Sequence, residues 1–264
     1  MTKKILITGS TDGIGLEACK ILAKDNHHLL LHGRNPGKLE TVKNEIIKAT
    51  GNQNIETYIA DLSRLEDINS FVDQIKQDHE KLDILINNAG ILKSPNPTTD
   101  DGFDIRFAVN TIAPYILAKQ LLPLLGSNGR VINLSSAAQA PVNLDALKGT
   151  ITGLGDMDAY SQSKLAITMW SYQMAQSSDT TIIAVNPGSL LASKMVKEGF
   201  GIEGKDISIG AEILVRLSLD DEFKNSSGKY FDNDIGQFSD PHPDALNIEK
   251  CTEVVSALDS IVRS

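Results

Sequence analysis

The chain has 264 residues, enough for one large α/β domain or two smaller ones. Hydrophobic residues make up 41% of the sequence and charged residues 22%, the composition of a packed globular protein. The formal net charge of −9 argues against a nucleic-acid-binding protein, because such proteins usually carry a net basic surface. The sequence therefore predicts no nucleic-acid partner, while a local basic pocket for a phosphate stays compatible with this charge.

The cysteines and the apolar runs predict a cytoplasmic protein. Cys19 and Cys251 are far apart and match no disulfide framework or ligand spacing, which is typical of a reducing compartment. The histidines form no metal-binding spacing, so we expect no metal site. The first apolar run is too short for a signal peptide, and no run approaches the roughly 20 residues that cross a membrane.

Strand-like and helix-like segments alternate along nearly the whole chain. The predicted strands are Lys4–Thr8, His28–His32, Ile55–Ala60, Ile84–Asn87, Arg130–Leu134, Thr181–Val185 and Lys229–Phe231. Apolar periodicity predicts helices, for example over Ile14–Lys24, Leu65–Gln77, Phe107–Leu125 and Ala159–Met174. This alternation predicts an α/β Rossmann fold, a doubly wound parallel sheet of about seven strands with helices on both faces. No linker divides the chain, so we expect one domain over residues 1–264.

Two segments interrupt the alternation, Ala137–Met157 and Gly188–Lys205. Both follow strand ends, and the ligand crevice of a doubly wound sheet lies beyond the carboxyl ends of its strands. We therefore predict that both segments overhang the crevice and face a substrate; ordinary surface loops with core anchors are an equal alternative. The second segment is rich in apolar residues, which favours an apolar substrate: Leu190, Leu191, Met195, Val196 and Phe200.

A glycine-rich turn follows the first predicted strand and opens the first predicted helix. Backbone amides at a helix N-terminus favour an anion, and glycines allow a pyrophosphate to approach the main chain closely. The spacing Gly-x3-Gly-x-Gly therefore predicts a dinucleotide site, although glycines after a strand can also be simple turn formers. The candidate cofactor-binding residues in this turn are Gly9, Ser10, Thr11, Asp12, Gly13, Ile14 and Gly15.

The end of the second predicted strand indicates which dinucleotide binds. Folds selective for NAD place an acidic residue there to hold the ribose 2′-hydroxyl. This chain has His32-Gly33-Arg34-Asn35 instead, with no acid and with an arginine that suits the 2′-phosphate of NADP. We predict that NADP(H) is preferred over NAD(H), with Arg34 and Asn35 near the phosphate; the alternative is a solvated loop charge.

The third predicted strand is followed by Asp61-Leu62, our candidates for contact with the adenine. The carboxylate of Asp61 could accept a hydrogen bond from the adenine amino group. A helix N-cap at Asp61 or Ser63 explains the same residues equally well.

The fourth predicted strand ends in Asn87-Asn88-Ala89-Gly90. The small residues Ala89 and Gly90 allow a cofactor to lie against the sheet edge. Asn88 is a further cofactor candidate, but Asn87 and Asn88 are better suited to tying neighbouring strands together.

Tyr160 and Lys164 are four residues apart, so a helix places both side chains on one face. A tyrosine that exchanges a proton near neutral pH has a free pKa of ~10, and a neighbouring cation lowers that value. Alone, this spacing is typical of a solvated helix face. The Ser135-Ser136 pair at the end of the fifth predicted strand and the glycine turn make a catalytic role the better interpretation.

Together these motifs resemble the short-chain dehydrogenase/reductase family along nearly the whole chain. The Tyr160 motif and the long interval from Ser136 to Tyr160 resemble the retinol-dehydrogenase-like branch of that family. The matching segments are Thr8-Gly9-x3-Gly13-Ile14-Gly15, Asp61, Asn87-Asn88-Ala89-Gly90, Asn110, Ser135-Ser136, Tyr160-x3-Lys164 and Asn186-Pro187-Gly188.

The resemblance implies a role for each catalytic candidate. Tyr160 is the general acid or base, and Lys164 lowers its pKa and binds the nicotinamide ribose. Ser136 binds the substrate oxygen, as the second serine of the pair. Asn110 holds a water that relays protons; a helix-interior asparagine bonded to nearby backbone is its alternative. The pair Pro187-Gly188 lies close to the nicotinamide.

The resemblance implies an oxidoreductase that interconverts a carbonyl (aldehyde or ketone) and an alcohol of a small molecule; Arg34 adds NADP(H) as its cofactor, and the segment after Gly188 adds an apolar substrate. The alternative is a sensor or scaffold of the same fold that binds NADP without turnover. Such proteins often lose the tyrosine or the lysine, and this chain keeps both, which favours the enzyme. Relatives are commonly dimers or tetramers, so a homo-oligomer is also expected.

Overall fold

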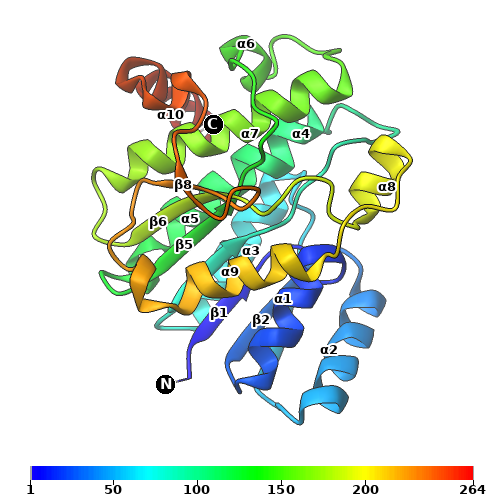
Figure 1. Cartoon of the computed structure of the whole chain (residues 1–264). Coiled ribbons are helices and arrows are strands. Elements are labelled where there is room, and N and C mark those ends of the chain that lie inside the picture. The colour runs from blue at the N-terminus through cyan, green and yellow to red at the C-terminus, as the bar shows by residue number, and fades with distance from the viewer. Residues whose placement is uncertain (1, 264) are drawn as a thin grey trace.

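The structure, a computed structural model, describes residues 2–263 except for the side chain of Phe200. Its centre is one sheet of eight strands in the order β3-β2-β1-β4-β5-β6-β7-β8. All neighbouring strands are parallel except β7 and β8, which are antiparallel (Figure 1). The strands are β1 (Lys4–Ile7), β2 (His28–Gly33), β3 (Ile55–Ile59), β4 (Ile84–Asn87), β5 (Arg130–Leu134), β6 (Thr181–Asn186), β7 (Tyr230–Asp232) and β8 (Gln237–Ser239).

All seven predicted strands are present, and the doubly wound parallel sheet is confirmed. The eighth strand, β8, was not predicted, since three residues are too few to display a pattern of alternation. It pairs with β7 across a tight turn at Gly236, whose φ is +68°.

Helices cover both faces of the sheet, as the strand–helix alternation predicts (Figure 1). No helix within residues 2–263 is long and apolar enough to span a membrane. The longer helices are α1 (Gly13–Lys24), α2 (Pro36–Thr50), α3 (Leu65–Asp78), α5 (Ala113–Leu125), α7 (Asp156–Ala175), α9 (Ser208–Leu219) and α10 (Ile248–Arg263). Shorter segments are α4 (Ile105–Phe107), η1 (Ala108–Ile112), α6 (Leu144–Leu147), α8 (Lys194–Phe200), η2 (Asp221–Phe223) and η3 (Pro243–Leu246).

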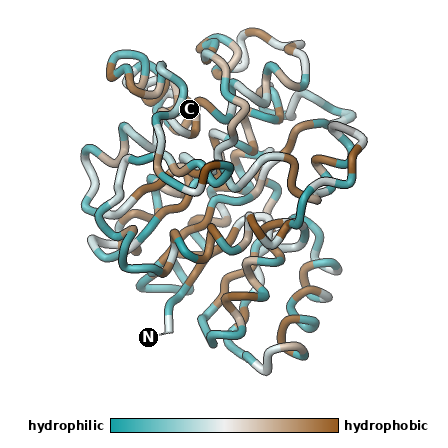
Figure 2. The backbone as a smooth tube through the Cα atoms, viewed as in Figure 1, coloured by the Kyte–Doolittle hydropathy of each residue, from teal (hydrophilic) through white to brown (hydrophobic). Residues whose placement is uncertain are grey.

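Two apolar layers sandwich the sheet, because successive side chains of a strand point to opposite faces. In β1, Ile5 and Ile7 join the layer formed with α1, α2 and α9, while Leu6 joins the layer formed with α3, α5, α7 and α10. Figure 2 shows the hydrophobic residues concentrated along the strands and the helix sides that face them. β1 lies between β2 and β4, so the strand order reverses there and the crevice opens at the carboxyl ends of β1 and β4.

The helix predicted over Phe107–Leu125 is interrupted in the structure. A short α-helix begins at Ile105, a π-helical turn follows over Ala108–Ile112, and α5 starts only at Ala113. Pro114 provides one reason, because it has no N–H to donate to the carbonyl of Asn110 four residues earlier. π-turns of this kind are frequent at functional sites.

The two segments predicted as loops lie at the carboxyl edge of the sheet, where α6 appears at the top and α8 at the right of Figure 1. Gly188–Lys205 is not a plain loop, since it contains α8. Its apolar residues divide between two roles: Leu191 and Val196 are buried, whereas Leu190 is 41% exposed and has a positive φ of 58°. The core-anchor interpretation therefore applies to Leu191 and Val196, and the substrate-facing role of the segment stays a prediction.

Candidate active site

The two serines after β5 point in different directions, as strand alternation predicts. Ser135 is buried, and its Oγ lies 2.8 Å from the Lys164 carbonyl oxygen and 2.7 Å from Thr168 Oγ1. Ser136 is half-buried; its Oγ accepts a hydrogen bond from Ala138 N at 3.1 Å and forms a side-chain hydrogen bond with Tyr160. Because Ser136 accepts from the backbone, its own proton is free for Tyr160 or for a substrate oxygen.

Tyr160 and Lys164 lie one turn apart on α7, with the Lys164 ammonium 5.7 Å from the centroid of the Tyr160 ring. Lys164 is 4% exposed and donates to the Leu134 carbonyl at 2.7 Å. Burial lowers the pKa of Lys164 to about 7. Burial raises the pKa of Tyr160, and the hydrogen bond with Ser136 lowers it by less. The lowering expected from Lys164 is therefore not found in this structure, where Lys164 is turned to a carbonyl and only partly charged at neutral pH.

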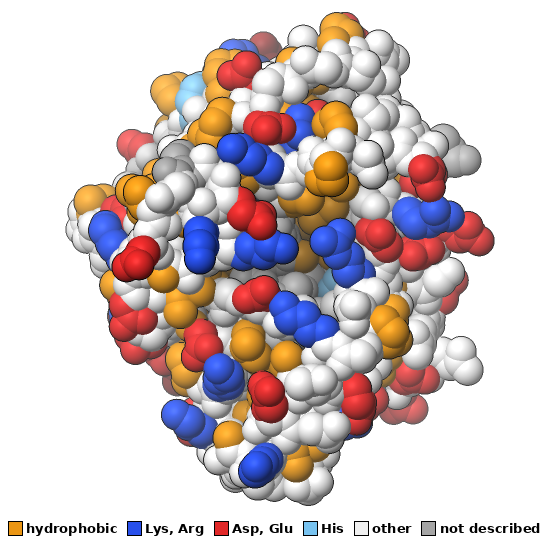
Figure 3. All heavy atoms as spheres, turned by 90° about the vertical axis from the view of Figure 1, so that its right-hand side faces the viewer, with side chains coloured by type: hydrophobic (Ala, Val, Ile, Leu, Met, Phe, Trp, Pro, Cys, Tyr) orange, Lys and Arg blue, Asp and Glu red, His pale blue; other side chains and the backbone are white. Residues whose placement is uncertain are grey.

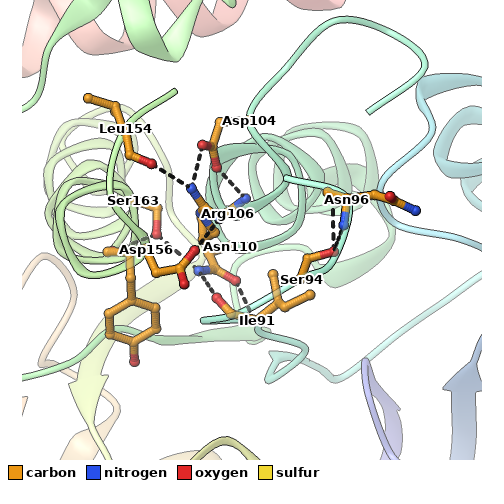
Figure 4. Close-up of polar contacts among 10 residues, drawn as sticks. Ile91, Ser94, Asn96, Asp104, Arg106, Asn110, Leu154, Asp156 and Ser163 are labelled. Carbon is orange, nitrogen blue, oxygen red and sulfur yellow. Dashed lines mark hydrogen bonds and ion pairs between the residues drawn. The ribbon is translucent and has the colours of Figure 1, made fainter. Parts of the chain in front are cut away.

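Asn110 lies in the π-turn and is fully buried. Its Oδ1 accepts from Ile91 N at 2.8 Å, and its Nδ2 donates to Ile91 O at 2.9 Å and to Ser163 Oγ at 3.0 Å (Figure 4). Ser163 in turn donates to the Tyr160 carbonyl at 2.6 Å. The alternative of a bond to nearby backbone does not hold, because Ile91 is 19 residues away. Asn110 thus joins the chain after β4 to the helix that carries Tyr160.

A buried ion cluster that the sequence analysis missed holds the start of α7. Arg106 has no exposed side-chain surface and donates to Asp104 at 2.7 Å, Asp156 at 2.9 Å and the Leu154 carbonyl at 3.4 Å (Figure 4). Burial is the main influence on Asp104 and raises the pKa of its carboxyl. Asp156 is the first residue of α7 and lies one turn before Tyr160, so this cluster fixes the helix end nearest the site.

The glycine turn packs so closely against the end of β4 that side chains have no room. A Cβ on Gly9, whose φ is +65°, would lie 2.9 Å from the Ala89 Cα, and one on Gly15 would lie 2.3 Å from Asn88 Nδ2. Asn88 donates to the carbonyls of Thr8 and Gly9 at 2.9 and 3.0 Å. Asn88 therefore ties β4 to the turn, the structural role the sequence favours for it.

The rest of the turn presents main-chain donors. Asp12 caps α1 by accepting from Gly13 N at 2.8 Å, and Ser10 donates to the His32 carbonyl at 3.0 Å. The amides of the first turn of α1, including that of Ile14, have no acceptor within the helix. An anion is stabilised at such a helix end.

Arg34 lies beside this turn, because Thr11 packs on the preceding glycine: a Cβ on Gly33 would meet Thr11 Cγ2 at 2.8 Å. Arg34 is exposed and makes no ion pair within residues 2–263. A second cation, Lys38, was missed: its Nζ lies 2.9 Å from Asp12, whose pKa it lowers.

Asn35, the other residue predicted near the phosphate, caps α2 by accepting from Lys38 N at 2.9 Å. Its side-chain oxygen is therefore engaged by the helix. The sequence does place Lys38 four residues after Arg34, and this spacing could have indicated a second cation near the start of α2.

At the end of β3, Asp61 Oδ1 accepts from the backbone and hydroxyl of Ser63 at 3.0 and 2.7 Å. The N-cap alternative was wrong for both residues, because the cap of α3 is Arg64, which makes no side-chain capping bond. The Leu62 side chain is buried in the core, so it presents no side-chain surface to a ligand.

Gly90 lies between Lys164 and α8: a Cβ built there would be 3.6 Å from Lys164 Nζ and 3.8 Å from Met195 Cε. Gly188, with φ +122°, donates a hydrogen bond from its N–H to Asn186 Oδ1 at 3.2 Å. Pro187 is buried, and its carbonyl accepts from Asn233 at 2.9 Å. The ends of β4 and β6 thus meet the candidates on α7 at one edge of the sheet.

Comparison with known proteins identifies the family. The family model described as short chain dehydrogenase matches residues 3–200. Retinol dehydrogenase 13 from Homo sapiens is 32% identical over 251 residues, which cover 87% of this chain and 76% of the relative. The chain belongs to the short-chain dehydrogenase/reductase family. Its similarity to retinol dehydrogenases places it in the retinol-dehydrogenase-like branch.

Solved structures of the family have the same fold. An uncharacterised protein from Mycobacterium paratuberculosis superposes with a TM-score of 0.81 at 23% identity, over 99% of this chain and 94% of the other. A short-chain dehydrogenase from Escherichia coli CFT073, complexed with NADPH, gives a TM-score of 0.71 at 28% identity, over 88% and 96% of the two chains. The short-chain dehydrogenase fold binds a nicotinamide cofactor, and its members are oxidoreductases acting on small molecules.

The residues at the carboxyl edge fit such a cofactor. The N-terminus of α1 can bind a pyrophosphate, and Gly90 places no side chain beside Lys164. Figure 3, which shows the side of the molecule bearing α8, has Lys and Arg side chains gathered around a central hollow. A basic rim suits the phosphates of a dinucleotide despite the net charge of −9.

Proposed function

We propose that this short-chain dehydrogenase is an NADP(H)-dependent oxidoreductase that interconverts an aldehyde or ketone and the corresponding alcohol. The observation that carries the proposal is the convergence of Ser136, Tyr160 and Lys164 at the carboxyl edge of the sheet, beside the glycine turn. In this proposal the whole chain, residues 1–264, acts as one NAD(P)-binding domain.

In the reducing direction, Tyr160 donates its hydroxyl proton to the substrate oxygen, and in the oxidising direction it removes that proton. Ser136 donates a hydrogen bond to the same oxygen and stabilises the charge that develops on it. Lys164 would hold the ribose of a bound cofactor, and its positive charge would favour the phenolate of Tyr160. The bound cofactor supplies or accepts the hydride.

Asn110 has a structural role in this arrangement. Both N–H groups of its side chain are used, by Ile91 O and Ser163 Oγ, so the water relay predicted from the resemblance cannot depend on a free N–H of this amide. We propose that Asn110 instead holds the segment after Gly90 against the Tyr160 helix.

The preference for NADP(H) rests on two cations at the start of α2. Arg34 is unpaired and exposed beside the glycine turn, where a 2′-phosphate would lie. Lys38 is close by but shares its charge with Asp12. The E. coli relative that binds NADPH supports the same cofactor for this chain.

The substrate in this proposal is apolar. Exposed apolar side chains lie on both segments at the carboxyl edge: Ile151 and Met157 on the first, and Leu190 and Ile202 on the second, each between 41% and 43% exposed. Single exposed apolar residues are ordinary, but their occurrence on both segments at the carboxyl edge favours a hydrophobic partner. The proposed location is the cytoplasm, where the two free, buried cysteines stay reduced.

The test is NADPH consumption with a panel of aliphatic and aromatic aldehydes and ketones, run in parallel with Tyr160→Phe. We expect turnover in the wild type and a loss of at least 100-fold in the variant, the usual scale of general acid catalysis. NADPH should bind both proteins equally. Tight NADPH binding with no turnover on any substrate would instead support the non-catalytic sensor or scaffold.

Arg34→Asp tests the cofactor preference. A charge-assisted contact contributes about 1.5–3 kcal/mol, so the variant should bind NADPH at least ~10-fold more weakly while binding NADH about as well as the wild type. Fluorescence titration with each cofactor measures both constants. Equal losses for NADPH and NADH would contradict a phosphate contact at this residue.

A further inference from the structure

The Ser136 backbone is held by a tyrosine that none of the recognised motifs contains. Tyr230 on β7 donates from its hydroxyl to the Ser136 carbonyl at 3.0 Å. The residue is 6% exposed, and its ring lines a cavity of about 570 Å³ between α7, β7 and β8. Burial raises the pKa of Tyr230 far above its ordinary value, so it remains a neutral donor at working pH.

A second donor converges on the same carbonyl oxygen. Gln139 Nε2 donates to Ser136 O at 3.0 Å, and its Oε1 accepts from His242 N at 3.2 Å. The Ser136 carbonyl therefore receives two hydrogen bonds, one from Tyr230 of β7 and one from Gln139, which lies in the segment after β5 and is itself bonded to His242. Two donors fill the acceptor capacity of one carbonyl oxygen and fix the plane of its peptide.

We propose that Tyr230 and Gln139 are positioning residues that orient Ser136 toward Tyr160 through its backbone carbonyl. The proposal rests on the proposed function, in which the Ser136 hydroxyl acts together with Tyr160. The two residues touch neither the Tyr160 hydroxyl nor a substrate in this scheme; they act by holding the peptide from which the Ser136 side chain projects. Without them the peptide can rotate, and the hydrogen bond from Ser136 to Tyr160 weakens.

The expected consequence is a change in the ionisation of Tyr160. The hydrogen bond with Ser136 lowers the pKa of Tyr160, so weakening it should raise that pKa. Within residues 2–263, the ionisable groups found to face Tyr160 are Lys164 on its own helix and Tyr230 on β7. Tyr230 is uncharged in the range of the titration, so losing its hydroxyl changes no charge near Tyr160.

The experiment is a pH titration of Tyr160 in the full chain by ¹³C NMR with tyrosine labelled at Cζ. The chain has five tyrosines, and Tyr160→Phe assigns the signal. We expect Tyr230→Phe and Gln139→Leu each to raise the Tyr160 pKa by about half to one unit, the equivalent of a neutral hydrogen bond. Tyr172→Phe is the matched control, because Tyr172 lines the same cavity without a hydrogen bond to Ser136. It should leave the titration unchanged.

Ser136→Ala separates this inference from the proposed function. If Ser136→Ala raises the Tyr160 pKa while Tyr230→Phe and Gln139→Leu leave it at the wild-type value, the positioning role is wrong. If Ser136→Ala also leaves it unchanged, the pairing of Ser136 with Tyr160 fails, and the inference fails with it. The signals of the other tyrosines report whether each variant is folded, and Gln139→Leu provides the same test should Tyr230→Phe misfold.

Discussion

Lys164 is an ionisable side chain in surroundings that disfavour its charged form. An ammonium group that is 4% exposed loses most of its hydration, and the structure gives it one carbonyl acceptor in return. Its pKa therefore falls to about 7, against 10.5 for an unburied lysine. Folding must either desolvate this charge or release its proton, so the residue is retained at a cost in stability. Such conflicts are characteristic of functional sites.

Lys164→Met should consequently stabilise the protein at neutral and lower pH. The unfolded chain holds the lysine proton up to about pH 10.5, whereas the folded chain releases it near pH 7, so the cost of burial is largest below pH 7 and disappears as the pH rises through this window. We expect the variant to be more stable than the wild type by about 1–3 kcal/mol at pH 7, and by progressively less toward pH 10. Urea unfolding at pH 6, 7, 8.5 and 10 measures the difference.

Lys43→Met provides the control for that series, because Lys43 is a half-exposed lysine on the surface of α2. It should show no comparable dependence on pH. A Lys164→Met variant whose stability relative to wild type stays constant from pH 6 to pH 10 would show that the lysine remains charged in the folded state.

At the scale of elements, α7 is held at its N-terminal end by contacts that join distant segments. The spacing of Tyr160 and Lys164 and the serine pair after β5 are local in the sequence, so they could be predicted. The ion pair of Arg106 with Asp156 spans 50 residues, and the bonds from Asn110 to Ile91 span 19. No periodicity or motif encodes such pairs, because they depend on how the π-turn and α7 pack after folding.

Removing Arg106, the cation of this cluster, should lower the free energy of unfolding more than removing Asp156, its more exposed anion. Arg106→Met leaves the Asp104 carboxylate buried without its cation, with only the backbone N–H of residue 106 as a donor, and should destabilise the protein by about 3–5 kcal/mol. Asp156→Asn should cost less, because Asp156 is 43% exposed and water replaces the contact. Arg106→Met combined with Asp104→Asn should recover part of the loss, since the orphaned charge is gone. Urea unfolding of the three variants decides the order.

Arg216→Met is the matched control, since Arg216 forms exposed ion pairs with Asp220 and Glu222. Pairs of that kind contribute about 0–1 kcal/mol, so its variant should unfold almost as the wild type does. If Arg106→Met and Arg216→Met were equally mild, the buried cluster would have no part in holding α7.

For the whole molecule, the C-terminal helix completes the packing around the catalytic helix. The middle of α7, from Ser163 to Ser171, is buried throughout, because the sheet covers one side and α5 and α10 cover the other. Tyr115 and Lys119 of α5 both bond to Asp259 of α10, and Tyr115 packs edge-on against Trp170 at 5.6 Å. The sequence of one helical segment does not reveal which other helices will cover Trp170, so this packing could not be predicted from it.

Leu258 of α10 is part of this packing, and its substitution tests whether α10 stabilises the helix that carries Tyr160. Leu258→Ala removes a fully buried side chain from the core cluster that contains Trp170, so we expect a loss of about 2–5 kcal/mol in the free energy of unfolding. The single tryptophan reports the change directly, since water reaching Trp170 shifts its fluorescence to longer wavelength. Ile235→Ala, at a residue that is 57% exposed, should change neither the stability nor the emission.

Because α7 carries both Trp170 and Tyr160, the urea concentration that halves NADPH turnover should fall together with the fluorescence midpoint in Leu258→Ala. A fluorescence change that leaves the activity midpoint at its wild-type value would mean that α10 loosens without disturbing the catalytic end of α7.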